Sequence, residues 1–344
     1  MNMRAIGLDA CDPVEARVHA TLRFASGVTA AFVLCEALKW WPTFMAPVFA
    51  AVLLTNLPAR PSMKIALVLT LTMALAAIFA YGISSLLRGT PTMLFGLIAL
   101  CVFLAFQAML GGRVRVPALL LLISLSTIPV VVMIAPAQAG ILPTAMVRGI
   151  ALALLAIGCV YLPWPQTLPR AAASAAVPTA PPSIATALLS TAIVMPLMLV
   201  YLLFGLADAL PVIVTTVLLV ATFDLQRGRL QAGAMILGNF AGGILGLLMH
   251  SLLLTQPNLV FLALLLFVVL LGFGQRIAAG GPAAAVALIT CNSMLIILSS
   301  AIAAGPGSLS VWLTRLFQFA LAGAFAVGMM TLVPQRTATR TTAS

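Results

Sequence analysis

Long apolar stretches without a charged residue recur along this chain and limit its folds more than any other feature. Only 7% of the 344 residues are charged and 63% are hydrophobic, whereas about a quarter of a soluble domain is charged. Inside lipid, backbone N–H and C=O groups are satisfied only in helices or closed barrels. Because the apolar stretches are continuous rather than alternating, they predict helices. The expected fold class is an all-α integral membrane protein embedded in the lipid bilayer.

The apolar stretches predict about 12 transmembrane helices, six in each half of the chain. Asp12 and Pro13 predict that the first helix begins at Pro13, ahead of the membrane. The expected parts are a cytoplasmic segment 1–20, a first six-helix repeat 21–163, a Pro- and Ala-rich linker 164–183, a second six-helix repeat 184–334, and a tail 335–344. The predicted spans are residues 21–38, 43–57, 65–87, 93–111, 116–135, 143–162, 184–206, 210–223, 229–252, 257–274, 282–303 and 310–333.

The basic residues are distributed unevenly between the two sides of the predicted membrane. With a cytoplasmic N-terminus, 13 of the 17 Lys and Arg residues lie on the cytoplasmic side, and the other four are Lys39, Arg88, Arg148 and Arg315. Short loops keep Lys and Arg on the cytoplasmic side, which predicts the orientation N-in/C-in. Six spans per half then give both halves the same orientation, as in parallel-repeat transporters. The expected location is the bacterial inner membrane, crossed many times.

Two short segments occupy matching places in the two halves. Residues 43–57 contain Pro47 and residues 210–223 contain Pro211, and both are shorter than the roughly 20 residues that span a bilayer. Short proline-containing segments at corresponding places indicate the binding region of a transporter. A tilted or partly buried short helix is an equally good interpretation.

Arg148 and Arg315 form a second matching pair. Each lies about five residues, or roughly 8 Å, into the last span of its half. An arginine in hydrocarbon is costly, and a guanidinium binds a carboxylate through two parallel hydrogen bonds. The pair therefore predicts a shared site for a small organic anion. Snorkelling to lipid headgroups and an internal salt bridge are the alternatives.

Acidic and polar residues in the spans complete the predicted translocation site. Glu36 ends the first span and Asp208 ends the seventh, and either could partner an arginine or take up a proton during transport. Glu36 could instead pair with Lys39, three residues on along a helix. Asn239 and Gln318 could line the path, although an interhelical hydrogen bond is the simpler interpretation of each.

Several other chemistries have no support in the sequence. The basic residues lie in loops rather than in one patch, which argues against binding of nucleic acid. A Walker A loop is missing, and so are the spacings typical of metal ligands or catalytic groups. The five cysteines are scattered, and we interpret them as small apolar packing residues. The sequence therefore predicts neither an enzyme nor a metal or cofactor site.

The run Leu22–Arg23–Phe24 and the following WWPTFMAPVFAAVLLTNLPARPS resemble the start of the fusaric acid resistance (FUSC) family. That family is a broad group of inner-membrane proteins that includes aromatic acid exporters. A first span that ends before Trp41–Pro42, a six-span unit present twice, and the arginine near the start of each sixth span also fit. Typical members have large cytoplasmic domains after each membrane unit, so this chain resembles a compact branch without them. The resemblance implies proton-driven efflux of small aromatic or hydrophobic carboxylic acids, often with a periplasmic membrane-fusion adaptor protein.

Other functions stay open beside this one. A major facilitator transporter also has six plus six spans, but its loop G-x-x-x-D-R-x-G-R is lacking in NLPARPSMK and only partly matched by DLQRGR. A non-transporting scaffold could use its arginines to hold lipids or a partner. An enzyme acting on lipids is least favoured, because few acid or base residues lie in the spans. The expected function is an efflux permease for small organic anions, and a homo-oligomer is compatible with it.

Overall fold

The structure is a computed structural model that describes residues 13–57, 59–111, 115–165, 184–204, 217 and 228–305. All the regular structure in these ranges is helical. Eight of the helices are long and apolar enough to cross a membrane, judged by length and composition, so the described chain is that of a multi-pass membrane protein. The helices are α1 (Pro13–Ala37), α2 (Met45–Asn56), α3 (Met63–Leu86), α4 (Pro91–Leu110), α5 (Arg115–Ile134), α6 (Pro136–Ala139), α7 (Ile141–Val160), α8 (Ile184–Phe204), α10 (Gly228–Thr255), α11 (Leu259–Ala279) and α12 (Gly281–Ala304).

Ten of the predicted spans coincide with helices, nine of them to within five residues at each end. The described part of the first helix starts at Pro13, eight residues ahead of the predicted span, and α11 continues to Ala279 rather than to residue 274. The other two spans, 210–223 and 310–333, lie outside the described residues except for Val217, which is helical and buried. The count of 12 spans therefore stays a prediction.

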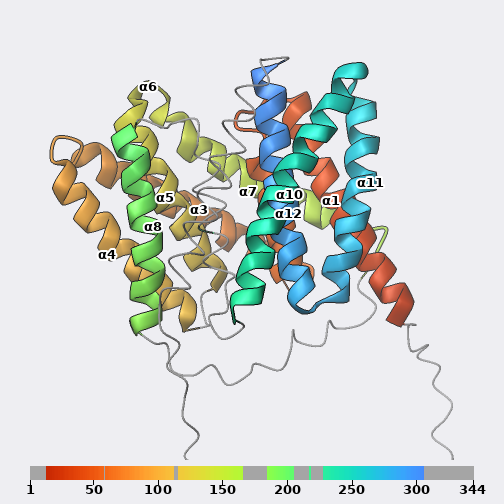
Figure 1. The fold of residues 1–344 in the computed structure, drawn as a ribbon, viewed down its shortest axis with the longest axis horizontal. Helices are drawn as coiled ribbons and strands as arrows, with labels where there is room; N and C mark the ends of the chain where they lie inside the picture. The colour runs from red at the N-terminus through yellow and green to blue at the C-terminus, as the bar shows by residue number, and fades with distance from the viewer. Residues whose placement is uncertain are drawn as a thin grey trace, which may run out of the picture.

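The helices form two groups that meet at α7 (Figure 1). On one side lie α3, α4, α5 and α8, and on the other lie α1, α10, α11 and α12. Within the groups, α3 packs against α5, α4 packs against α5 and α8, α10 packs against α12, and α1 packs against α11. The first helix after the linker, α8, thus lies among helices of the first half, whereas α1 packs against α11 of the second half and against α2 and α7 of its own.

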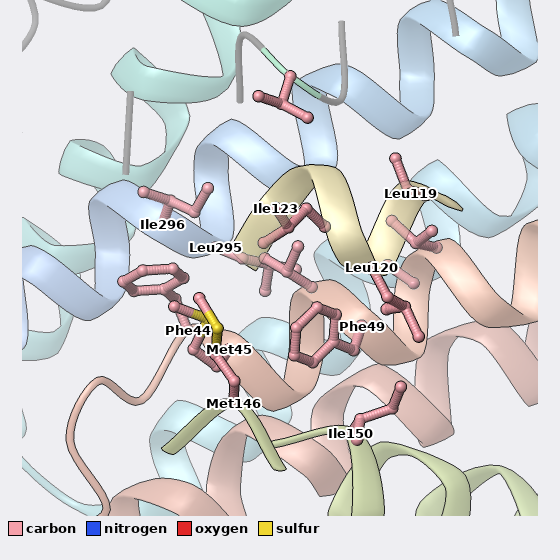
Figure 2. Close-up of a cluster of buried hydrophobic side chains, with 14 of the residues drawn as sticks. Phe44, Met45, Phe49, Leu119, Leu120, Ile123, Met146, Ile150, Leu295 and Ile296 are labelled. Carbon is pink, nitrogen blue, oxygen red and sulfur yellow. The ribbon is translucent and has the colours of Figure 1, made fainter. Parts of the chain in front are cut away.

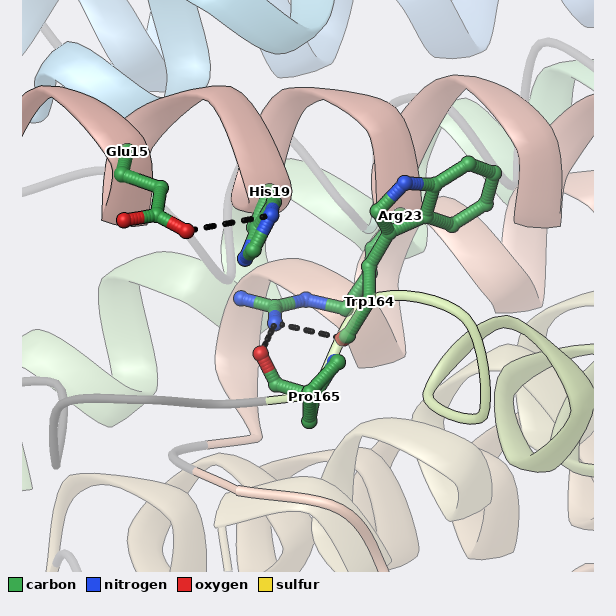
Figure 3. A network of polar contacts seen from close by, with 5 residues as sticks. All are labelled: Glu15, His19, Arg23, Trp164 and Pro165. Atoms are coloured by element: carbon green, nitrogen blue, oxygen red, sulfur yellow. Dashed lines mark hydrogen bonds and ion pairs between the residues drawn. The ribbon is translucent and has the colours of Figure 1, made fainter. Parts of the chain in front are cut away.

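One end of the bundle, here named the Arg23 end, is fastened by Arg23 near the start of α1. Its Nη1 donates hydrogen bonds to the carbonyl oxygens of Trp164 (3.0 Å) and Pro165 (3.1 Å), just after α7 (Figure 3). Its guanidinium also lies over the ring of Tyr161, with Cζ 4.8 Å from the ring centroid. Because the start of α1 meets the end of α7, the two helices are antiparallel.

The short helix α2 is buried among the long ones. Its residues from Met45 to Leu53 are all buried. Twelve residues of helix extend about 18 Å, so α2 cannot by itself cross a hydrocarbon core of about 30 Å. In Figure 2 apolar side chains of α5, α7 and α12 surround the start of α2. The labelled members of this apolar cluster are Phe44, Met45, Phe49, Leu119, Leu120, Ile123, Met146, Ile150, Leu295 and Ile296.

Glycines bring α10 and α12 into close contact. A Cβ atom added at Gly242 would lie 2.2 Å from the carbonyl oxygen of Thr290, and one at Gly246 would lie 2.8 Å from the carbonyl oxygen of Met294. Contact between backbones at this distance requires residues without a side chain, as is common in membrane helix pairs. The pair α10–α12 is therefore fixed by backbone packing.

Candidate functional site

Arg148 lies at the end of the bundle opposite Arg23, here named the Trp40 end. It follows the start of α7 at Ile141 by seven residues, which is about 10 Å along the helix. The guanidinium lies over the ring of Trp40, with Cζ 5.2 Å from the ring centroid. Within the described chain Arg148 makes no hydrogen bond or ion pair, and its Nε atom is buried. The cation thus has an aromatic contact but no anionic partner among these residues.

The N-terminus of α2 lies beside this arginine. At Gly149, the next residue of α7, an added Cβ would lie 3.1 Å from Cβ of Met45 and 3.4 Å from the backbone nitrogen of Ala46. A helix N-terminus has a partial positive charge of roughly half a unit, so α2 adds to the positive potential around Arg148.

Glu36 lies in the last turn of α1, at the same end of the bundle. Its half-buried carboxylate interacts with the hydroxyl of Thr43, which precedes α2. Glu36 precedes Trp40 by four residues, and Arg148 of α7 lies over the Trp40 ring. Yet no ion pair joins Glu36 to Arg148 in the part of the chain that the structure describes. The carboxylate and the guanidinium therefore lie at the same end of the bundle but are not paired with each other.

The predicted alternative pair of Glu36 with Lys39 has no ion pair in the structure either, and both residues are described. Helix α1 ends at Ala37, and Lys39 lies beyond it with a φ of 50°. The spacing along a helix that would bring the two side chains together therefore does not apply.

Thr43 connects the site to α12. Its Oγ1 is hydrogen-bonded to Oγ of Ser299, and both residues are buried. Ser299 is 256 positions away and belongs to the second predicted repeat. Sequence reasoning missed both residues, because a single hydroxyl in an apolar segment gives no sign of its partner.

Trp40 and Cys35 were also missed as members of the site. A tryptophan at the end of a span is typical of an interface anchor, and a cysteine within a span is typical of apolar packing. In the structure Cys35 is 2% exposed, but it lies where Arg148, Glu36 and the start of α2 meet. One feature of the sequence could have indicated that these two residues belong to the site. Both lie at the junction between the first predicted span and the short second span.

The other predicted site residues fall into two classes. Asn239 on α10 accepts a hydrogen bond from Ser293 of α12, and both are buried, so the interhelical bond is the arrangement observed. Arg315, Asp208 and Gln318 lie outside the described residues. Their roles, and the pairing of the two arginines, stay predictions.

The described residues hold no group of three or more His, Cys, Asp or Glu that could hold a metal ion. The site instead combines a guanidinium, a carboxylate, two linked hydroxyls, a thiol and an indole ring. Such a set binds small organic ions through charge, hydrogen bonds and contact with an aromatic face.

Comparison with known proteins identifies one family for part of the chain. Residues 20–161 match the model of a family described as a protein of unknown function, DUF2955. The comparison with curated proteins gave no match, and the comparison with solved structures gave none. The resemblance to the fusaric acid resistance family stays a prediction. Over α1 to α7, which hold Arg148 and Glu36, this chain is similar to the DUF2955 family.

Proposed function

We propose that this protein is a bacterial inner-membrane permease that exports small organic anions, chiefly aromatic or hydrophobic carboxylic acids, in a proton-driven process. The observation that supports this function most is the state of Arg148, a guanidinium with a buried Nε and no hydrogen bond in the described chain. Holding an arginine at the centre of a membrane helix costs about 2.5–3.5 kcal/mol on insertion scales. A ligand carboxylate would offset part of this cost by accepting two parallel hydrogen bonds from the guanidinium.

The short helix α2 supports the same site. Discontinuous helices in transporters direct their N-termini at anionic groups of the substrate near the middle of the membrane. The N-terminus of α2 is buried next to Gly149 and Cys35. A carboxylate on Arg148 would therefore also lie in the positive potential of this helix end.

The helix contacts support a duplicated architecture with repeats 21–163 and 184–334. Helix α3 packs on α5 as α10 packs on α12, and α4 packs on α5 as α11 packs on α12. The first helix of each half packs on the fourth of the other, α1 on α11 and α8 on α4. In this correspondence the segments 210–223 and 310–333 match α2 and α7, and the proposed pathway includes Arg315, Asp208 and Gln318.

The apolar cluster of Figure 2 lies next to the site and packs the centre of the bundle. Phe44 and Met45 belong to the cluster and are the residues at which α2 begins, and Phe49 lies one turn further along the helix. An anion could not cross this packed region without movement of α2 relative to α5 and α12. The described arrangement is therefore a closed state in the proposed transport cycle.

The charge distribution of the sequence assigns the Trp40 end to the periplasmic side. The proposed exit site then faces the compartment in which a membrane-fusion adaptor protein could receive the anion. A second copy of the chain is compatible with this arrangement but is not needed for the site.

Flux through reconstituted vesicles tests the proposed function. The probe is labelled 3-phenylpropionate, which has one carboxylate on an aromatic body, under an imposed proton gradient. Wild-type protein is expected to transport it, and Arg148→Gln should reduce the initial rate at least tenfold, because a carboxylate loses a charge-assisted bidentate partner. Arg88→Gln is the matched control, since Arg88 is exposed just after α3 and should keep the wild-type rate.

Two results would contradict the proposed function. Equal rates for Arg148→Gln and wild type, at equal protein content, would exclude Arg148 from the pathway. Absence of any flux through the wild-type protein would favour a non-transporting membrane subunit, whose arginine holds lipid or a partner.

A further inference from the structure

We infer that the transported anion crosses the bundle between α2 and α12, along a contact here named the seam, and that a buried hydroxyl pair holds this seam closed. The inference rests on the proposed function and locates its pathway. The seam joins the start of α2 to one face of α12, and its members are Thr43, Phe44, Met45, Asn292, Leu295, Ile296 and Ser299.

Helix α2 is held to α1 and α7 by glycines on those two helices. An added Cβ at Gly149 of α7 would lie 3.1 Å from Cβ of Met45, and one at Gly27 of α1 would lie 3.1 Å from Cδ1 of Leu54. The two contacts lie near the two ends of α2. Because both leave little room for a side chain, α2 forms one closely packed unit with α1 and α7.

Helix α12 is held to α10 in a similar way. An added Cβ at Gly238 of α10 would lie 2.7 Å from Oγ1 of Thr290, and one at Gly242 would lie 2.2 Å from the carbonyl oxygen of the same residue. Asn239 of α10 also accepts a hydrogen bond from Ser293 of α12. Helices α10 and α12 therefore form a second closely packed unit.

The two units meet at the seam through side chains rather than through glycines. Helix α2 contains no glycine, and the one glycine of α12 is Gly281 at its start, where an added Cβ would meet nothing within 4 Å. Across the seam, the apolar cluster of Figure 2 places Phe44 and Met45 with Leu295 and Ile296. Packed helices can slide along such side-chain contacts, so the two units separate most readily along the seam.

The hydroxyl pair of Thr43 and Ser299 crosses the seam at the Trp40 end, where Arg148 also lies. Both residues are buried and hydrogen-bonded to each other. Other buried hydroxyls in this protein bond to a carbonyl of their own helix, as Ser124 does to Leu120 at 3.0 Å. Ser299 can make the same bond within α12 when the seam opens. The pair is therefore a reversible tie between the two units.

Asn292 is a second polar residue on the seam. It precedes Leu295 and Ile296 by three and four residues and Ser299 by seven, so all four share one face of α12. Asn292 is 2% exposed, and no group in the described chain is hydrogen-bonded to its Oδ1 atom.

The position of Asn292 indicates when it finds a partner. It lies eleven residues after α12 begins at Gly281, near the middle of a helix about 36 Å long. Burial of an amide without a hydrogen bond is unfavourable, and Asn292 sits on a face that is otherwise apolar at this depth. Water or a polar group of the anion would complete its hydrogen bonds once the seam opens.

Thiol labelling tests whether the seam opens, in a full-length variant whose five cysteines are replaced by alanine. In this background Asn292→Cys places a thiol on the seam, and Ser293→Cys places one on the face packed against α10. Both positions are buried in the closed state. Asn292→Cys is expected to react with methanethiosulfonate ethylsulfonate about tenfold faster than Ser293→Cys. Adding Thr43→Val should raise its rate a further factor of about two to ten, since a buried hydrogen bond of the closed state is lost.

Two engineered disulfides in the same background test whether the seam must open for transport. Thr43→Cys with Ser299→Cys joins α2 to α12 across the seam, and Asn239→Cys with Ser293→Cys joins α10 to α12 within one unit. Both pairs replace a hydrogen bond between helices, so both should form on oxidation. Oxidation of the first pair is expected to reduce the flux of 3-phenylpropionate about tenfold, and a reductant should restore it. Oxidation of the second should leave the flux of its reduced form unchanged.

The inference is overturned if Asn292→Cys reacts no faster than Ser293→Cys. It is also overturned if the disulfide across the seam fails to form, or forms and leaves the flux unchanged. In each case, loss of flux in Arg148→Gln would leave the proposed permease standing with a different path. If the wild-type protein shows no flux, the proposed function fails, and the seam is not an anion path even where its thiol reacts. Thermal unfolding of each variant establishes that it is folded.

Discussion

The guanidinium of Arg148 lies over the indole ring of Trp40, with Cζ 5.2 Å from the ring centroid. This contact joins α7 to the junction between α1 and α2, where the bundle also holds Glu36 and Cys35. A ring face attracts the cation without accepting a hydrogen bond from it. The guanidinium has no anionic partner among the described residues, and the ring fixes its position.

Replacing Trp40 tests whether the ring positions the arginine. Trp40→Leu should weaken binding of 3-phenylpropionate by about 1–2 kcal/mol, since a desolvated cation–π contact is worth about that much. Trp40→Phe should restore most of the affinity. Trp41→Leu is the control, because Trp41 is 47% exposed and should bind as wild type. Equal losses in Trp40→Leu and Trp41→Leu, measured by calorimetry, would mean that the ring contact does not serve binding.

The hydroxyl link between Thr43 and Ser299 should be measurable as a coupling energy. Thr43→Val and Ser299→Ala each remove one partner of a buried hydrogen bond, which leaves the other unsatisfied and costs about 1–3 kcal/mol. The double variant should be destabilised by less than the sum of the two single variants. Thermal unfolding in detergent provides the comparison, and strict additivity would show that the two hydroxyls do not interact.

Arg23 should contribute to stability rather than to binding. Arg23→Gln removes two hydrogen bonds from a charged donor to the carbonyl oxygens of Trp164 and Pro165, and we expect a loss of about 1.5–3 kcal/mol. Arg17→Gln, at an exposed position of the same helix, should change the unfolding midpoint little. The prediction fails if the two variants unfold at the same temperature, or if Arg23→Gln abolishes ligand binding while its fold is intact.

The backbone contact between α10 and α12 predicts a large effect from a single methyl group. In Gly242→Ala the new Cβ would lie 2.2 Å from a carbonyl oxygen of Thr290, so the helices must separate, at a cost of about 1–3 kcal/mol. In Gly272→Ala, within α11, the new Cβ would meet nothing within 4 Å. The first variant should lower the unfolding midpoint and the second should not. A Gly242→Ala protein as stable as wild type would show that these two backbones are not in contact.

The positions of the helices followed from the sequence because each depends on local properties. Apolar length predicted ten helices, nine of them to within five residues at each end. The shortness of residues 43–57 predicted the short helix α2. These features are set by residues close in the chain, so no knowledge of tertiary packing was needed.

The sequence predicted only some of the site residues, because the contacts of the site join residues that are distant in the chain. Charge in an apolar segment was enough to single out Arg148 and Glu36. The ring of Trp40 and the hydroxyl pair of Thr43 and Ser299 gave no such signal, since an aromatic or hydroxyl side chain is common at a span end or within a span. The pairing of Glu36 with Lys39 assumed that the helix continued past Ala37, which it does not.

Locating a bound ligand tests directly whether Arg148 binds the carboxylate of the transported anion. Crystals of the full-length protein grown with 3-(4-bromophenyl)propionate would give an anomalous signal from the bromine and density for the carboxylate. We expect one ligand at the Trp40 end, with its carboxylate hydrogen-bonded to Nε of Arg148 and next to the N-terminus of α2. Ligand density elsewhere in the bundle, with Arg148 still lacking an anion at saturating concentration, would contradict it.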